Sequence, residues 1–141
     1  MKRSLFAIGV ITAGIVAAVI ATGPATARPL TLTSPAVTCH GAVGWQKAVS
    51  LEGSVATLVG RVAGTKFASS SNGSPTFLDV GRPYPNPARL SIVIWIENRA
   101  SFGRPEVKYR GRTICVRGLV SDYAGSPEII VRSPSQITIK N

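Results

Sequence analysis

Between residues 54 and 132, short apolar runs repeatedly give way to stretches rich in Gly, Pro, Asn and Ser. Runs of this length are typical of strands, because amphipathic helices need longer periodic segments, and the intervening stretches supply turns. The pattern predicts strands at residues 54–63, 76–80, 89–96, 112–121 and 128–132. Residues 97–109 are polar and suit a short helix between the third and fourth strands. The chain is therefore predicted to be an all-β protein with one short helix.

Two glycines stand at matching places in the first and fourth predicted strands. They lie in residues 58–62 (LVGRV) and 116–120 (VRGLV), which share an apolar-x-Gly-x-Val frame. A glycine there suits the bent strands of a small barrel, where it relieves side-chain crowding, and Gly60 also suits a bulge or bend. Alternation assigns three groups of apolar side chains to inner faces: Ala56, Leu58 and Val62; Leu90, Ile92, Ile94 and Ile96; Ile114, Val116 and Val120. Three strands, a helix and two strands is the order of the five-stranded OB-fold barrel, which binds oligonucleotides and oligosaccharides.

The start of the sequence predicts an export signal. Lys2 and Arg3 precede an apolar run at residues 5–21, and residues 25–27 (ATA) give the small-x-small pattern that a signal peptidase reads. We interpret residues 1–27 as a signal peptide, 28–44 as an extended lead-in and 45–141 as an OB-fold-like domain. Cleavage would leave no stable membrane span and would place the protein in the periplasm, in the cell envelope or outside the cell. The alternative is an uncleaved anchor, because the apolar run is about long enough to cross a bilayer.

The chain is strongly basic without this signal. The full sequence has 16 Lys and Arg against 6 Asp and Glu. Without Lys2 and Arg3 the net charge is 14 minus 6, or about +8. A basic surface attracts polyanions such as nucleic acid, anionic lipid headgroups or cell-wall polymers. The alternative is that the charge only keeps an exported protein soluble.

Cys39 and Cys115 are the only cysteines in the sequence. In an oxidising compartment a small, even number favours one disulfide, which would close a long loop and stabilise the fold by roughly 4 kcal/mol. Two free thiols or a metal site are the alternatives. A metal site would need more ligands, and His40 is the only histidine. We therefore expect a disulfide and no metal.

Several segments resemble a known family. Residues 77–85 (FLDVGRPYP) are similar to a characteristic stretch of small bacterial OB-fold modules, which look like nucleic-acid-binding domains and often accompany nuclease domains. Residues 45–48 (WQKA), 109–112 (YRGR), 123–129 (YAGSPEI) and 133–137 (SPSQI) also match. These motifs are mostly turns and core positions, so the resemblance implies architecture more than ligand. Cys39 precedes the matching region and Cys115 has an outward strand position, so a bridge between them would attach the lead-in to the barrel wall.

The sequence contains no visible arrangement for catalysis. Metal-dependent phosphodiester cleavage needs clustered carboxylates, yet only Asp79 lies within the body of a predicted strand, and no two acids are visibly spaced to converge. His40 is the only histidine for a Ser/His/Asp site and lies in the lead-in. Residues 41–44 (GAVG) lack the lysine of a phosphate-binding loop. We therefore predict no enzyme activity and no cofactor.

We predict instead a binding module for single-stranded nucleic acid or another polyanion, with little sequence specificity. OB-folds bind such strands by stacking bases on aromatic rings and placing cations along the phosphates, on the outer face of the second and third strands and the adjoining loops. The residues that map to this surface are Arg61, Lys66, Arg82, Tyr84, Arg89, Trp95, Tyr123 and Arg132. Trp95 is the strongest of them, because alternation points it outward from the third strand.

These residues also have a purely structural interpretation. Tyr84 stands between prolines and would pack on a barrel end, Tyr123 would pin the last hairpin, and the arginines would only face solvent. Trp45 is interpreted as a cap over the barrel bottom. The alternative function is then a structural or protein/glycan-interaction module of the cell envelope, with an envelope protein as its partner.

Overall fold

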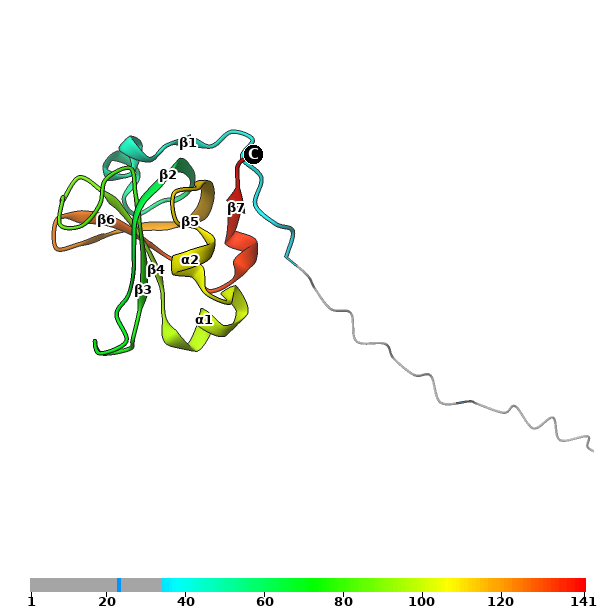
Figure 1. The fold of residues 1–141 in the computed structure, drawn as a ribbon. Helices are drawn as coiled ribbons and strands as arrows, with labels where there is room; N and C mark the ends of the chain where they lie inside the picture. The colour runs from blue at the N-terminus through cyan, green and yellow to red at the C-terminus, as the bar shows by residue number, and fades with distance from the viewer. Residues whose placement is uncertain (1–22, 24–33) are drawn as a thin grey trace, which may run out of the picture. The chain divides into compact units, whose positions relative to one another are not determined.

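The computed structural model describes Gly23 and residues 34–141. Apart from Gly23, the predicted signal peptide and residues 28–33 of the predicted lead-in lie outside the described residues. Residues 34–141 contain a barrel of longer strands and two short flanking strands, β1 (Val43–Gly44) and β7 (Ile137–Ile139). The barrel strands are β2 (Val55–Phe67), β3 (Thr76–Val80), β4 (Leu90–Ile94), β5 (Thr113–Tyr123) and β6 (Ser126–Ile130) (Figure 1).

The barrel is closed. β2 pairs with β3, β3 with β4, β4 with β6 and β6 with β5, and β5 pairs back with β2. β4 and β6 run parallel, whereas the other neighbouring barrel strands run antiparallel. The helices α1 (Ile96–Phe102) and α2 (Pro105–Lys108) occupy the expected place between the third and fourth barrel strands, and Gly103 at φ 76° separates them. The predicted all-β, five-stranded OB-fold-like barrel is confirmed.

The barrel interior contains the side chains that alternation assigned to it. Leu58, Ile92 and Ile114 are fully buried there, together with Ile129 from β6. Each such side chain contributes about 1.5–3 kcal/mol by leaving water. Ile96 is the exception, because it begins α1 instead of continuing β4, and it is exposed.

The two matching glycines relieve crowding, as expected. A Cβ at Gly60 would lie 2.4 Å from Cγ1 of Val80 and 2.6 Å from Cδ1 of Trp45. A Cβ at Gly118 would lie 2.5 Å from Cγ2 of Ile129. Gly60 itself pairs regularly with β5, and the register shift in β2 falls between Val62 and Gly64 instead. The ring of Trp45 packs against the core, as its interpretation as a cap requires.

Several strand boundaries differ from the sequence prediction. β2 continues beyond residue 63 to Phe67, because its last residues pair with β3. β4 ends at Ile94, and Trp95 precedes the first turn of α1. The last hairpin is longer than predicted, with only Ala124 and Gly125 between its strands. Both have positive φ, which matches the twist of a two-residue hairpin turn.

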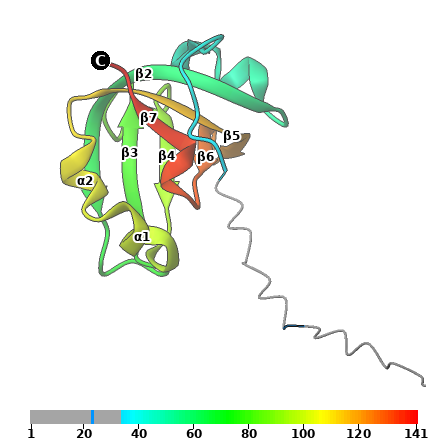
Figure 2. The same ribbon diagram turned by 90° about the vertical axis from the view of Figure 1, so that its right-hand side faces the viewer.

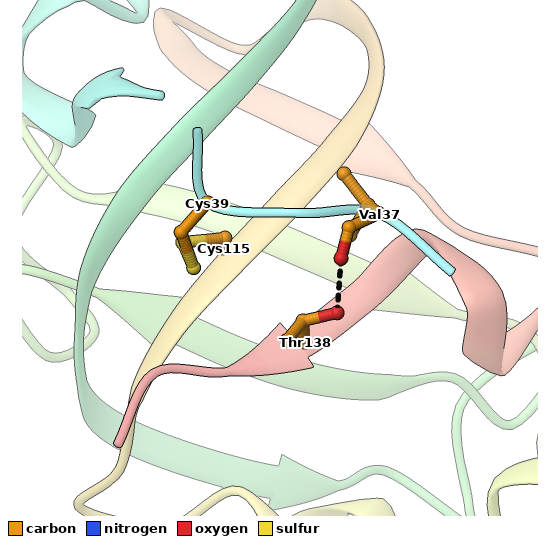
Figure 3. Close-up of a disulfide and its surroundings, with 4 residues drawn as sticks. All are labelled: Val37, Cys39, Cys115 and Thr138. Carbon is orange, nitrogen blue, oxygen red and sulfur yellow. Dashed lines mark hydrogen bonds between the residues drawn. A yellow bond between two sulfur atoms is a disulfide. The ribbon is translucent and has the colours of Figure 1, made fainter. Parts of the chain in front are cut away.

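The end of the lead-in is attached to the barrel at three places. Cys39 forms the predicted disulfide with Cys115 of β5, and the two Cα atoms are 5.5 Å apart (Figure 3). The N–H of Val37 donates to the carbonyl of Ser135 at 2.8 Å, and the hydroxyl of Thr138 in β7 donates to the carbonyl of Val37. β1 pairs in parallel with β2. The segment therefore runs along the barrel wall beside β7 (Figure 2).

Short 3-10 turns complete the domain. They span Trp45–Lys47, Val49–Leu51 and Pro134–Gln136. Among the described residues, no helix is both long and apolar enough to cross a membrane.

Candidate ligand-binding site

A pocket of about 280 Å³ opens on the outer face of β3, β4 and β6. This volume is close to the lower end for small-molecule sites, so the pocket suits a ligand of one or two rings. The strands supply its floor, and the adjoining loops supply its rim. Its lining residues are Lys66, Ala68, Ser71, Phe77, Asp79, Tyr84, Arg89, Ser91, Tyr123, Ser126 and Glu128.

A row of polar residues crosses four strands, and three of its members lie in the pocket floor. Asp79 of β3 lies opposite Ser91 of β4, Ser91 lies opposite Glu128 of β6, and Glu128 lies opposite Ser121 of β5. Residues paired in this way have their side chains on the same face of a sheet. Strand pairing therefore brings two carboxyl groups, far apart in the sequence, onto one surface.

Asp79 is extensively hydrogen-bonded within the protein. Its Oδ1 accepts from Nε of Arg89 at 3.1 Å and from the hydroxyl of Ser91 at 3.5 Å. Its Oδ2 accepts from the backbone N–H of Tyr84 at 3.3 Å. Burial raises the pKa of Asp79, and these hydrogen bonds and the charge of Arg89 only partly offset that effect. Asp79 is thus a structural anchor for the loop between β3 and β4.

Glu128 is the second carboxyl group of the floor and has fewer partners. Burial raises the pKa of Glu128; a hydrogen bond with Ser121 opposes the rise and the charge of Asp122 adds to it. Within the described residues, no ion pair involves Glu128. Raised pKa values for two carboxyl groups of one pocket are typical of functional sites.

Two tyrosines form the rim of the pocket. Tyr84 is 73% exposed and Tyr123 is 70% exposed, although both line the pocket. The guanidinium of Arg89 lies 5.2 Å from the centre of the Tyr84 ring. Rings that are this exposed have at least one face available to a ligand.

The β3–β4 loop that carries Tyr84 is held in place by hydrogen bonds at both ends. The N–H of Gly81 donates to the carbonyl of Arg61 at 2.8 Å, and the hydroxyl of Ser126 donates to the carbonyl of Pro87 at 2.9 Å. Arg89 also donates from Nη1 to the carbonyl of Asn86 at 2.8 Å. These bonds fix the rim before any ligand arrives, which lowers the entropic cost of binding.

The structure brings together half of the residues predicted to bind a ligand. Lys66, Tyr84, Arg89 and Tyr123 line the pocket, and Lys66 does so from the end of β2 instead of from the following loop. The other four do not line it. Arg61 is exposed on β2, Arg82 is exposed in the β3–β4 loop, and Arg132 is exposed beyond the end of β6.

Trp95 has a different position from the one expected. It follows β4 and is half-buried, and a Cβ built on Gly73 would lie 2.8 Å from its ring. Its indole therefore packs against the loop between β2 and β3. In this position Trp95 supports the loop and does not line the pocket.

Sequence reasoning missed most of the pocket floor. Phe77, Ser91, Ser126 and Glu128 line the pocket but were not predicted as ligand-binding residues. Phe77, Ser91 and Glu128 lie in predicted strands, whereas Ser126 precedes the predicted strand at residues 128–132; apolar alternation did not reveal which strands pair. Within the described residues, no group of three or more His, Cys, Asp or Glu side chains is arranged to hold a metal ion.

Solved structures of known proteins are similar to this domain. An OBody bound to hen egg-white lysozyme matches with a TM-score of 0.50 and 18% identity, over 71% of this chain and 95% of that chain. Asparaginyl-tRNA synthetase from Pyrococcus horikoshii matches with a TM-score of 0.48 and 19% identity, over 70% of this chain and 22% of that chain. The Stn1–Ten1 complex of S. pombe matches with a TM-score of 0.44 and 20% identity, over 61% of this chain and 57% of that chain.

No protein-family model matches the sequence, and no curated protein matches it. At such low identity, the OBody match bears on the fold alone. It agrees with the strand order, in which β5 closes the barrel against β2. The domain is an OB-fold.

Proposed function

We propose that this protein is an exported OB-fold module that binds single-stranded nucleic acid on the face formed by β3, β4 and β6. The pocket between Tyr84 and Tyr123 is the observation that carries the proposal, because its two exposed rings lie at the edge of a base-sized cavity. In the proposed complex a base stacks on one or both rings and enters the pocket. Such stacking contributes about 1–3 kcal/mol per base.

Positive charge supports the same proposal. Lys66 and Arg89 line the pocket, and Arg82 is exposed in the loop that also carries Tyr84. In an unpaired strand the phosphates lie outside the stacked bases, so these cations are suitably placed to track the backbone. The net charge of about +8 without the signal residues adds a general attraction for polyanions.

Export is supported by the disulfide and by the N-terminal sequence pattern. Disulfides persist in oxidising compartments outside the cytoplasm. Intact-mass measurement of the protein recovered from both the medium and the membranes of a bacterial host would test this part. We expect a chain that begins at Arg28, and a retained N-terminus would instead support an uncleaved anchor.

The binding experiment is a fluorescence anisotropy titration with a labelled oligo-dT strand at low and moderate salt. We expect binding that weakens steeply as salt rises. Tyr84→Ala and Tyr123→Ala should each weaken it about tenfold, within the range for loss of one stacked base. Leu119→Ala is the matched control, because Leu119 is also exposed but does not line the pocket. No binding at low salt would reject nucleic acid as the ligand.

A second candidate is a glycan-binding module of the cell envelope. The pocket combines tyrosine rings with two carboxyl groups, and its acidic and basic residues are equal in number, with Lys66 and Arg89 against Asp79 and Glu128. Sugar rings pack on aromatic faces, and carboxylates accept hydrogen bonds from hydroxyl groups. Salt-independent binding of a neutral oligosaccharide, lost in Tyr123→Ala, would favour this candidate over the first.

A further inference from the structure

The two carboxyl groups of the pocket floor differ in how far their oxygens are already used in hydrogen bonds within the protein. Both oxygens of Asp79 accept hydrogen bonds from within the protein. Glu128 has Ser121 as its hydrogen-bonding neighbour, and no ion pair involves it within the described residues. It lines the pocket and is half-buried. Glu128 is therefore the floor carboxylate that is available to a ligand.

An ionised carboxylate is an acceptor only, so it selects ligand groups that donate. The nucleobases differ in what they offer to such a group. Guanine presents its N1–H and one hydrogen of its N2 amino group side by side, which allows two parallel hydrogen bonds to one carboxylate. Thymine and uracil present a single N3–H between two carbonyl oxygens, and those oxygens are repelled by the carboxylate.

The adjoining edge of guanine also has suitable partners in this pocket. Guanine carries two acceptors, O6 and N7, which lysine and arginine bind well. Lys66 and Arg89 both line the same cavity as Glu128. Arg89 already donates hydrogen bonds to Asp79 and Asn86, so Lys66 is the cation whose side chain can move to meet a ligand. The pocket thus offers an acceptor and a donor to a base that needs both.

We propose that this pocket selects guanine over thymine and uracil, with the carboxylate of Glu128 reading the N1–H and N2–H donors. This inference rests on the proposed binding of single-stranded nucleic acid and makes that binding selective. The sequence analysis predicted binding with little specificity for nucleotide sequence, and the present inference differs from that prediction. The remaining contacts, between phosphates and surface cations, stay independent of sequence.

The test compares two labelled strands in the anisotropy assay: a short oligo-dT, and the same strand with one central dG. We expect the dG strand to bind about tenfold more tightly, within the range for one good bidentate contact to a base. Replacing dG by deoxyinosine removes the N2 amino group and should lose part of this preference. This comparison needs no change to the protein, so it does not depend on how a variant folds.

Glu128→Gln tests the residue itself. The amide has nearly the same shape, but one of its two terminal groups donates, so it cannot accept two hydrogen bonds side by side. We expect the preference for the dG strand to disappear, because the amide loses the paired contact with guanine and no longer repels the carbonyl oxygens of thymine. Glu52→Gln is the matched control, because Glu52 is exposed and does not line the pocket; it should keep the preference.

Each outcome decides between the proposals. Equal binding of both strands by the unmodified protein overturns the guanine inference and leaves the proposed function standing. A preference that survives Glu128→Gln overturns the role of Glu128. If neither strand binds at low salt, both proposals are rejected together.

Discussion

Arg89 donates from Nε to Oδ1 of Asp79 at 3.1 Å, and this ion pair joins the β3–β4 loop to the floor of the pocket. Both side chains are largely buried, so the pair is little screened by solvent. The other oxygen of Asp79 accepts from the backbone N–H of Tyr84, at the rim. One carboxylate therefore holds both the Arg89 side chain and the backbone of Tyr84, two residues that the proposed site uses.

Arg89→Ala should destabilise the domain in a pH-dependent way. The charge of Arg89 lowers the pKa of Asp79 in the folded state, so its loss raises that pKa further above the unfolded value. The stabilisation by Arg89 is present where Asp79 is ionised and is lost as pH falls through the folded pKa. We expect a loss of about 1–3 kcal/mol at pH 7, measured by urea unfolding, and a smaller loss near pH 3. An equal loss at both pH values would contradict this. Arg82→Ala, an exposed arginine of the same loop, is the control.

Gly81→Ala should cost much more stability than Gly53→Ala. Both glycines have nearly the same positive φ, 82° and 80°, so both substitutions carry a similar backbone cost of about 1–2 kcal/mol. A Cβ at Gly81 would lie 2.0 Å from Cε2 of Trp45, whereas nothing lies within 4 Å of one at Gly53. The difference in unfolding free energy should be about 1–3 kcal/mol, the usual cost of overpacking. In a Trp45→Ala background this difference should shrink, and its persistence there would exclude a steric origin.

Removing the disulfide should lower the free energy of unfolding by about 4 kcal/mol. Cys39 and Cys115 are 76 positions apart, and a loop of that size loses much conformational entropy in the unfolded chain when it is closed. Urea unfolding of the Cys39→Ala/Cys115→Ala double variant provides the measurement. Dithiothreitol should destabilise the unmodified protein by a similar amount and leave the double variant unchanged. Equal stability with and without the bridge would contradict this and would show that the disulfide itself does not stabilise the fold.

Glu106→Gln should destabilise the domain at neutral pH only. Burial alone would raise the pKa of Glu106, but its backbone hydrogen bond, the bidentate contact with Arg99 at 3.0 and 3.1 Å, and the charge of Arg104 hold it below the ordinary value. A lowered folded pKa gives stability that is present above the unfolded pKa and is lost as pH falls through the folded one. We expect a deficit of about 1–3 kcal/mol at pH 7 that vanishes near pH 2. Glu97→Gln, on an exposed side chain, should show no deficit.

Much of the barrel was predictable because apolar residues recur at every second position along parts of its strands, and these residues face the interior. Leu58, Ile114 and Ile129 are buried where apolar alternation or strand position placed them. The end of β2 was not predictable, because its last residues include Thr65 and Lys66, which are not apolar. They are in a strand only because β3 folds back beside them, and such tertiary pairing overrides local preference.

The sequence predicted only those residues of the candidate site that lie in loops or at strand ends. Tyr84 and Tyr123 lie beside turns that the sequence marks with Gly and Pro, so their place at one end of the sheet could be inferred. Glu128 reaches the pocket through the parallel pairing of β4 with β6, which joins segments distant in sequence. Trp95 was misplaced because alternation was extended past Ile94, where the chain turns into α1.

The covalent attachment of Cys39 to β5 decides how the domain responds to mechanical load. A pull on the chain ahead of Ser34 first loads the hydrogen bonds of Val37 and then reaches the barrel covalently at Cys115, a buried position that β2 and β7 flank on either side. The load then enters near the beginning of β5 and bypasses the start of β2, so it does not pull the β2–β3 hairpin apart strand from strand. A tether at this end would therefore load β5 near its beginning and not at Tyr123, the opposite end of the strand, which lines the pocket.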